Sequence, residues 1–152
     1  MKKIASVATP VLIVAFVLSA AYAQFDKPED AIKYRQSVMF LIGQHIKRMG
    51  TVVKGKAPYD KDDFAANADV VAMLTTLPWQ AFMQPGTDKG DTTMTAAVFE
   101  KEDQFREIAD ALESSAAKLA RTAKGGDLNA IKAQFGKVVQ NCGTCHKEFR
   151  KK

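Results

Sequence analysis

The C-terminal stretch DLNAIKAQFGKVVQNCGTCHKEF, residues 127–149, is the most informative part of this sequence. Its apolar and cysteine side chains recur every three or four residues, at Leu128, Ile131, Phe135, Val138, Cys142, Cys145 and Phe149. That spacing places them on one face of an α-helix. Asp127 is a preferred N-cap residue, and Gly125-Gly126 before it are typical of a helix end. The stretch therefore predicts a C-terminal helix that begins after Asp127 and buries one face.

Cys142-Gly143-Thr144-Cys145-His146 within this helix has the form C-x-x-C-H, the attachment signature of a c-type haem. Side chains three residues apart share a helix face, so both thiols can reach the two vinyl groups of one porphyrin. His146 follows directly and can bind the iron as the proximal axial ligand. The motif predicts one covalently attached haem c per chain.

Three other interpretations of the cysteines fit less well. A thioredoxin-like pair is expected beside a βαβ pattern, of which the sequence has no sign. A structural zinc site needs four ligands, and the chain beyond residue 23 has two Cys and two His, His45 and His146. A disulfide between Cys142 and Cys145 would be strained, because the two residues share a helical turn.

Three further helices are expected upstream. Pro28, Glu29 and Asp30 suit a first helical turn, and the following stripe is Ile32, Arg35, Met39, Ile42, Ile46, Met49 and Val53, ending near Gly55 and Pro58. A second helix is expected to begin after Asp60 or Asp62 and to end at Leu77, before Pro78. Its apolar stripe is Phe64, Ala68, Val71, Leu74 and Leu77, and Asn67 lies beside this stripe. A third is expected over residues 96–124, with Phe105, Ile108, Leu112, Ala116, Leu119 and Ala123 on one face.

Residues 78–94, rich in Pro, Gly, Thr and Asp, are expected to form a long loop, which in a small domain often forms a wall of a functional site. No segment alternates with period two, so no sheet is expected. The predicted fold class is all-α: an antiparallel four-helix bundle with one covalently attached haem.

Composition excludes several classes of protein. The chain has 152 residues, is 47% hydrophobic, carries a formal charge of +5 and contains two cysteines. The hydrophobic share excludes intrinsic disorder, and two cysteines are too few for a disulfide scaffold. A mildly basic balance does not predict nucleic-acid binding.

The first 23 residues have the layout of a secretory signal peptide. Lys2 and Lys3 precede the apolar run VLIVAFVL at residues 11–18, and Ala21-Tyr22-Ala23 fits a cleavage site. A retained membrane anchor is the alternative, because residues 4–23 are uncharged. Pro10, the many small residues and the lack of a basic cluster after residue 23 favour cleavage. We expect a mature domain of residues 24–152, charge +3, exported to a bacterial periplasm without membrane association.

A four-helix bundle with one C-x-x-C-H near its C-terminus resembles the class II c-type cytochromes, and the chain from Gln24 onward is most similar to the cytochrome c′ family. The resemblance rests on QFDKPED at residues 24–30, YRQ at 34–36, KGKAPYD at 54–60, LPW at 77–79, and CGTCH followed by Phe149-Arg150. Many members have Tyr where Phe149 stands.

The resemblance implies roles for residues outside the motif. Met39 matches the bulky residue on the distal face of a five-coordinate iron, and Arg35 and Gln36 match residues that bind the haem propionates. Arg35 lies on an apolar stripe, where a charge is costly unless paired; contact with solvent or with a carboxylate is the alternative. Arg150 matches a basic residue near the proximal face, although a cation there also suits the helix dipole.

The loop is expected to wall the haem. Trp79, Phe82 and residues 87–93 are candidates for this wall, with Asp91 and Thr93 as candidates on the propionate side, although an aromatic residue near a loop is more often plain core. The resemblance also implies a homodimer through the first two helices. Val38, Leu41 and Val52 are compatible with such an interface if they are exposed.

The resemblance implies a function in binding small diatomic gases, NO or CO, at an open apolar iron site, together with electron transfer to a redox partner that the sequence does not identify. The alternative is a six-coordinate low-spin electron carrier with Met39 as sixth ligand, because a thioether also binds haem iron. A peroxidase-like enzyme would need a distal base, and the spare histidine, His45, is expected on a different face from Met39. We therefore expect no enzymatic activity.

Overall fold

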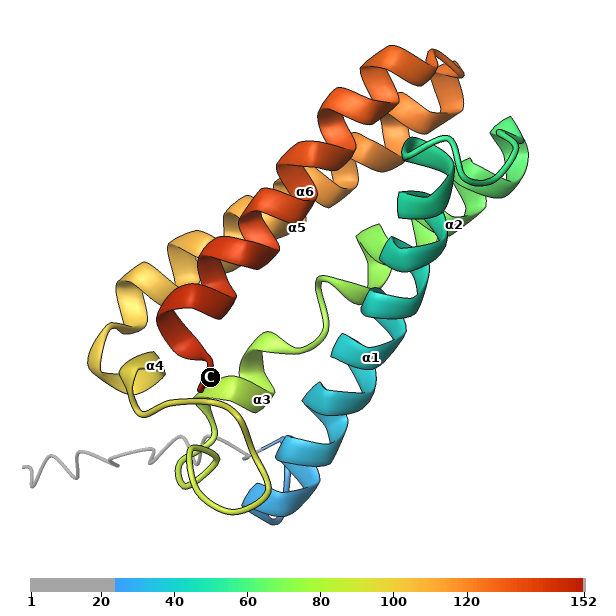
Figure 1. The fold of residues 1–152 in the computed structure, drawn as a ribbon. Helices are drawn as coiled ribbons and strands as arrows, with labels where there is room; N and C mark the ends of the chain where they lie inside the picture. Colours follow the sequence, from blue (N-terminus) through green and yellow to red (C-terminus); the bar gives the residue numbers. More distant parts are fainter. Residues whose placement is uncertain (1–23, 152) are drawn as a thin grey trace, which may run out of the picture.

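The computed structural model describes residues 24–151, so the predicted signal peptide lies outside the described residues. Four long helices form an elongated bundle (Figure 1): α1 (Pro28–Val53), α2 (Lys61–Leu74), α5 (Glu102–Gly125) and α6 (Leu128–Phe149). α1 packs on α2, α2 on α5, and α5 on α6. Two short helices, α3 (Trp79–Met83) and α4 (Ala97–Glu100), lie between α2 and α5 in the chain. The four predicted helices are thus present.

The buried face of α1 is centred beside the predicted stripe. Ile32, Arg35, Ile42 and Met49 are buried as expected, but Met39, Ile46 and Val53 are only half-buried. Val38 is buried, at 6% exposure, because it packs in the main core cluster. Val38 is therefore not exposed, as a residue of the predicted dimer interface would have to be. Leu41 is exposed, and Val52 is half-buried.

α2 begins as predicted and ends earlier. The Asp60 side chain accepts a hydrogen bond from the amide of Asp63, which caps the helix. The predicted end at Leu77 is wrong, because α2 ends at Leu74 and residues 75–77 form turns. Pro78 disfavours helical geometry at the residue before it, which contributes to the early end.

The predicted loop and third helix are each more divided than expected. The loop contains α3, and the expected helix over residues 96–124 is split into α4 and α5. The break falls at Lys101, whose φ of −127° and ψ of 46° are not helical. Its amide still bonds to the carbonyl of Ala97, and its carbonyl starts α5. Gly126, at φ 80°, ends α5 in the left-handed conformation that suits glycine.

α6 is held at both ends. Asp127 accepts hydrogen bonds from the amides of Asn129 and Ala130, as the N-cap prediction requires. At the other end, the amide of Thr95 donates to Phe149 and that of Lys151 donates to Thr93, at 3.0 and 2.7 Å. This pairing is an isolated bridge, and the described residues form no strand. It fastens the end of α6 to the segment before α4.

The core has two parts. The main cluster draws on all four long helices, and the second contains Met94, Val98, Phe105 and Phe149. Trp79 packs against both clusters. Within residues 24–151, no helix is long and apolar enough to cross a membrane.

Candidate haem-binding site

The C-x-x-C-H motif occupies the last two turns of α6. Cys142 is half-buried against the main core cluster, and Cys145 is half-buried against the second. Gly143, Thr144 and His146 are exposed. The two thiols therefore emerge from the same side of the helix while the residues between them face solvent, as the spacing predicts.

Both cysteines are free thiols. Burial raises the pKa of Cys142, and burial together with the neighbouring Cys142 raises the pKa of Cys145 to about 11. Although His146 is exposed as a whole residue, desolvation of its imidazole by the surrounding protein, and then the positive charge of Arg150, lower the pKa of this histidine. The imidazole is therefore biased toward its neutral form, which is the form that binds a metal.

Arg35 fastens the 78–94 segment to α1. It is 2% exposed, and its guanidinium donates to the carbonyls of Ala81 and Thr87 at 3.2 and 2.6 Å and to the Thr92 hydroxyl at 2.7 Å. It also lies over the ring of Phe82, 4.8 Å from the centroid. Burial lowers the pKa of Arg35 to about 10, with Asp88 opposing that shift. The charge is held by carbonyls and a hydroxyl rather than by a close carboxylate.

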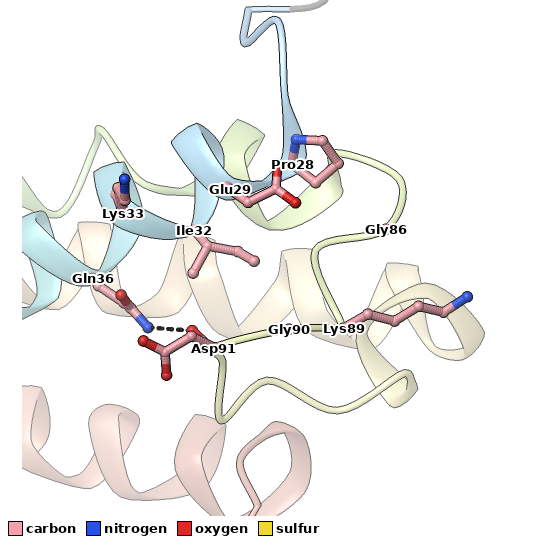
Figure 2. A pocket seen from close by; sticks show the side chains of 9 residues that line it. All are labelled: Pro28, Glu29, Ile32, Lys33, Gln36, Gly86, Lys89, Gly90 and Asp91. Carbon is pink, nitrogen blue, oxygen red and sulfur yellow. Dashed lines mark hydrogen bonds between the residues drawn. The ribbon is translucent and has the colours of Figure 1, made fainter.

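Gln36 makes the next contact between α1 and the loop. Its side-chain amide donates to the carbonyl of Asp91 at 2.9 Å, as Figure 2 shows. Both residues line a surface cavity of about 210 Å³ between the start of α1 and residues 86–91, where the side chains of Lys33 and Lys89 point outward (Figure 2). Arg35, Gln36 and Asp91, predicted separately, are thus brought to one region.

An aromatic cluster lies beside this region. Trp79 and Phe82 stack with centroids 6.1 Å apart, and both contact Phe105, which meets Phe149 edge-on. The indole Nε1 of Trp79 is buried and has no hydrogen-bond partner among the described residues. A buried N–H without an acceptor is rare in folded proteins, so this donor indicates a missing acceptor.

Arg150, Thr93 and Thr92 differ from the sequence expectations in detail. Arg150 is exposed and pairs through its backbone with Met94, close enough to His146 to affect its pKa. Thr93 is exposed and offers its carbonyl to Lys151, whereas the hydroxyl that bonds to Arg35 belongs to Thr92. Sequence reasoning missed Thr92 because nothing distinguishes it from Thr93 before the loop is folded.

Met39 and His45 lie on different sides of α1. Met39 is half-buried and packs against the main cluster. His45 is hydrogen-bonded through Nδ1 to Asn67 of α2 at 2.8 Å, and Asn67 in turn donates to Asp63. The spare histidine is therefore engaged at the α1–α2 contact.

The residues present fit a haem with two propionates. Arg35 uses three of the five N–H donors of its guanidinium, which leaves donors for an anion. Trp79 Nε1 offers another. Val139 is 43% exposed although apolar, and it precedes Cys142 by three residues and His146 by seven, so all three share a face. Figure 1 shows α1 and α6 diverging toward the end that carries the motif.

Comparison with known proteins gives a consistent result. Residues 30–150 match the model of the protein family described as Cytochrome C′. Cytochrome c′ from Alcaligenes xylosoxydans xylosoxydans is 43% identical over 129 residues, which cover 85% of this chain and 99% of that protein.

Two solved structures from Alcaligenes xylosoxidans are also similar. They are the nitric oxide complex of one variant of cytochrome c prime and the carbon monoxide-bound form of another. Each is 42% identical, with a TM-score of 0.79, and covers 85% of this chain and 100% of the solved chain.

The helical bundle, the C-terminal C-x-x-C-H motif, and the buried hydrogen-bond donors of Arg35 and Trp79 together define a c-type haem protein. The chain belongs to the cytochrome c′ family. The predicted four-helix bundle and covalently attached c-type haem are thereby confirmed.

Proposed function

We propose that this protein binds NO or CO at the iron of its haem. Solved relatives that are 42% identical hold nitric oxide and carbon monoxide. The observation within this chain that carries the proposal is the apolar side of α1, where Met39 and Ile46 are half-buried and the spare histidine is directed to Asn67. Such a site favours uncharged diatomics, because a polar ligand would lose hydrogen bonds with water on entry.

In this proposal the motif and its surroundings hold the haem. Cys142 and Cys145 would form the thioether bonds, and His146 would bind the iron. Arg35, Gln36 and Trp79 would donate hydrogen bonds to the propionates, and Phe82 and the loop that Arg35 anchors would form the wall. The haem supplies a reversible iron(II)/iron(III) couple, which also permits electron transfer.

The optical spectrum of the ferrous protein tests the proposal. We expect a high-spin spectrum that shifts on addition of CO. A sharp low-spin spectrum that does not respond to CO would contradict gas binding and favour the second candidate, a six-coordinate electron carrier with the Met39 thioether as ligand.

Two variants separate the roles of Met39. If Met39 only crowds the site, Met39→Ala keeps the high-spin spectrum and binds CO more tightly. If Met39 is a ligand, the same change converts a low-spin spectrum to a high-spin one. Ile46→Ala is the matched control, because Ile46 is half-buried on the same helix and has no ligating atom. It should leave the spin state unchanged.

We also expect no catalytic turnover, because the histidine outside the motif, His45, is not free to act as a distal base. His45 is hydrogen-bonded at the α1–α2 contact, where it is not available as a distal proton acceptor. Addition of hydrogen peroxide and a reducing dye should therefore give no oxidation above that of free haem. Turnover well above that background would contradict this part of the proposal.

Export and dimerisation complete the proposal. A mature chain starting at Gln24, found in the periplasmic fraction by mass spectrometry, is the expected result. Exposed apolar side chains on α1, on α2 and in the turn after α2 support a homodimer: Phe40, Leu41, Met73 and Leu77 are 40–64% exposed. Leu41→Glu should give a monomer by light scattering, whereas Ala133→Glu, exposed on α6, should not.

A further inference from the structure

The charges of the four long helices are segregated. α1 contains four Lys or Arg and two acids, both in its first turn, and α6 contains three Lys and one acid, Glu148. Residues 60–74, which contain α2, have four acids and one base, and residues 100–113 have six acids and two bases. Two helices are thus basic, while α2 and the first half of α5 are acidic.

The two basic helices lie on the same side of the bundle. Figure 1 shows α6 in front of α5 and α1 in front of α2. We define the basic face as five exposed lysines on the two front helices or directly after α1: Lys33, Lys47, Lys54, Lys132 and Lys147. The haem attachment motif lies on one of these helices, so the basic face and the cofactor share α6.

No ion pair neutralises the basic face. The three ion pairs found among residues 24–151 use the basic groups of Lys101, Arg106 and Lys124, which belong to other parts of the chain. Unpaired lysines on the two helices give charge complementarity to an acidic protein surface.

We propose that the basic face docks an acidic redox protein, which exchanges one electron with the haem. This inference rests on the electron-transfer part of the proposed function. In the reductive direction, the partner loses one electron and the ferric iron becomes ferrous. Lysines spread along two diverging helices differ from the short polybasic segments that bind anionic lipids, which favours a protein partner.

Electron transfer from reduced flavodoxin, an acidic one-electron donor, tests the proposal with the full haem protein. We expect the second-order rate constant to fall at least about tenfold between 20 and 200 mM salt, because screening weakens steering over that range. Lys47→Glu/Lys132→Glu should slow the reaction about tenfold at 20 mM salt. The control Lys118→Glu/Arg121→Glu makes the same change in net charge at exposed positions of α5 and should slow it less than twofold.

A binding measurement that needs no electron transfer accompanies the kinetics. Oxidised flavodoxin, added to the isotopically labelled protein, should shift the amide resonances of α1 and α6 more than those of α2 and α5. Equal effects of the two double variants, or shifts centred on α2 and α5, would overturn the docking proposal. Equal or tighter binding to anionic vesicles or duplex DNA would also overturn it.

The two proposals fail differently. If ferric protein is reduced by dithionite but not by flavodoxin, docking fails and the redox capacity of the haem stands. If resonances of the basic face shift while dithionite produces no ferrous protein, the electron-transfer part of the proposed function fails instead, and the interaction surface stands.

Discussion

Arg35→Met is the most informative single substitution, because Arg35 joins α1 to a segment 46–57 residues further along the chain. The variant keeps a long apolar side chain at a position that is 2% exposed. It removes the charge and every donor. The carbonyls of Ala81 and Thr87 then lose the donor that Arg35 supplies, whereas the hydroxyl of Thr92 keeps the amide of Met94 as a partner.

The expected loss is a balance of two effects. A hydrogen bond from a charged donor contributes about 1.5–3 kcal/mol, so three contribute about 6 kcal/mol. Burial lowers the pKa of Arg35 to about 10, and this shift corresponds to roughly 3 kcal/mol of desolvation cost that methionine does not bear. We therefore expect Arg35→Met to lower the free energy of unfolding by about 3 kcal/mol.

Guanidinium chloride unfolding of the haem-bound protein, followed by circular dichroism at 222 nm, measures this loss. Arg106→Met is the matched control, because Arg106 is exposed and makes only a pair with Glu102 on the same helix. It should cost about 0.5 kcal/mol. A loss below about 1 kcal/mol for Arg35→Met would refute the view that its hydrogen bonds hold the loop on α1.

Three further predictions use the same measurement. Phe105→Ala, at a residue 1% exposed among three aromatic rings, should cost about 3–5 kcal/mol, whereas Phe40→Ala, at 64% exposure, should cost less than about 1 kcal/mol. Asp127→Ala should cost about 1 kcal/mol through loss of the α6 cap, and an unchanged midpoint would contradict the capping role. Trp79→Phe keeps an aromatic ring and removes the buried N–H. If a propionate accepts a hydrogen bond from that N–H, the free energy of unfolding of the haem-bound variant should fall by about 1–3 kcal/mol. A fall of less than about 0.5 kcal/mol would count against this contact.

The helices and the haem attachment motif could be predicted because they depend on residues close together in the sequence. Asp60 and Asp127 cap helices as expected, because capping depends on a side chain and amides two or three residues away. Gly126 ends α5 for an equally local reason, its positive φ. The C-x-x-C-H motif needs only helical geometry to bring two thiols to one side.

Errors arose where long-range packing competes with local pattern. Met39 and Val38 fit a helical stripe about equally well, and burial of Val38 is decided by the packing of α1 on α2. The break at Lys101 lies in a stretch whose periodicity continues across it, so the pattern alone predicts one long helix. α2 stops at Leu74 although its apolar stripe extends to Leu77.

The residue pattern was sufficient to predict the class of fold, the covalent haem and the starts of α1, α2 and α6. Which groups meet around the haem region became known only from the packing of the helices. Arg35 donates to two backbone carbonyls and to the Thr92 hydroxyl. Every residue has a backbone carbonyl, so the sequence does not show which ones an arginine will contact. The orphaned N–H of Trp79 and the shared side of the two basic helices likewise exist only once distant segments pack together. The physical reason is range: caps and spacings act within a turn or two, whereas these contacts join residues tens of positions apart.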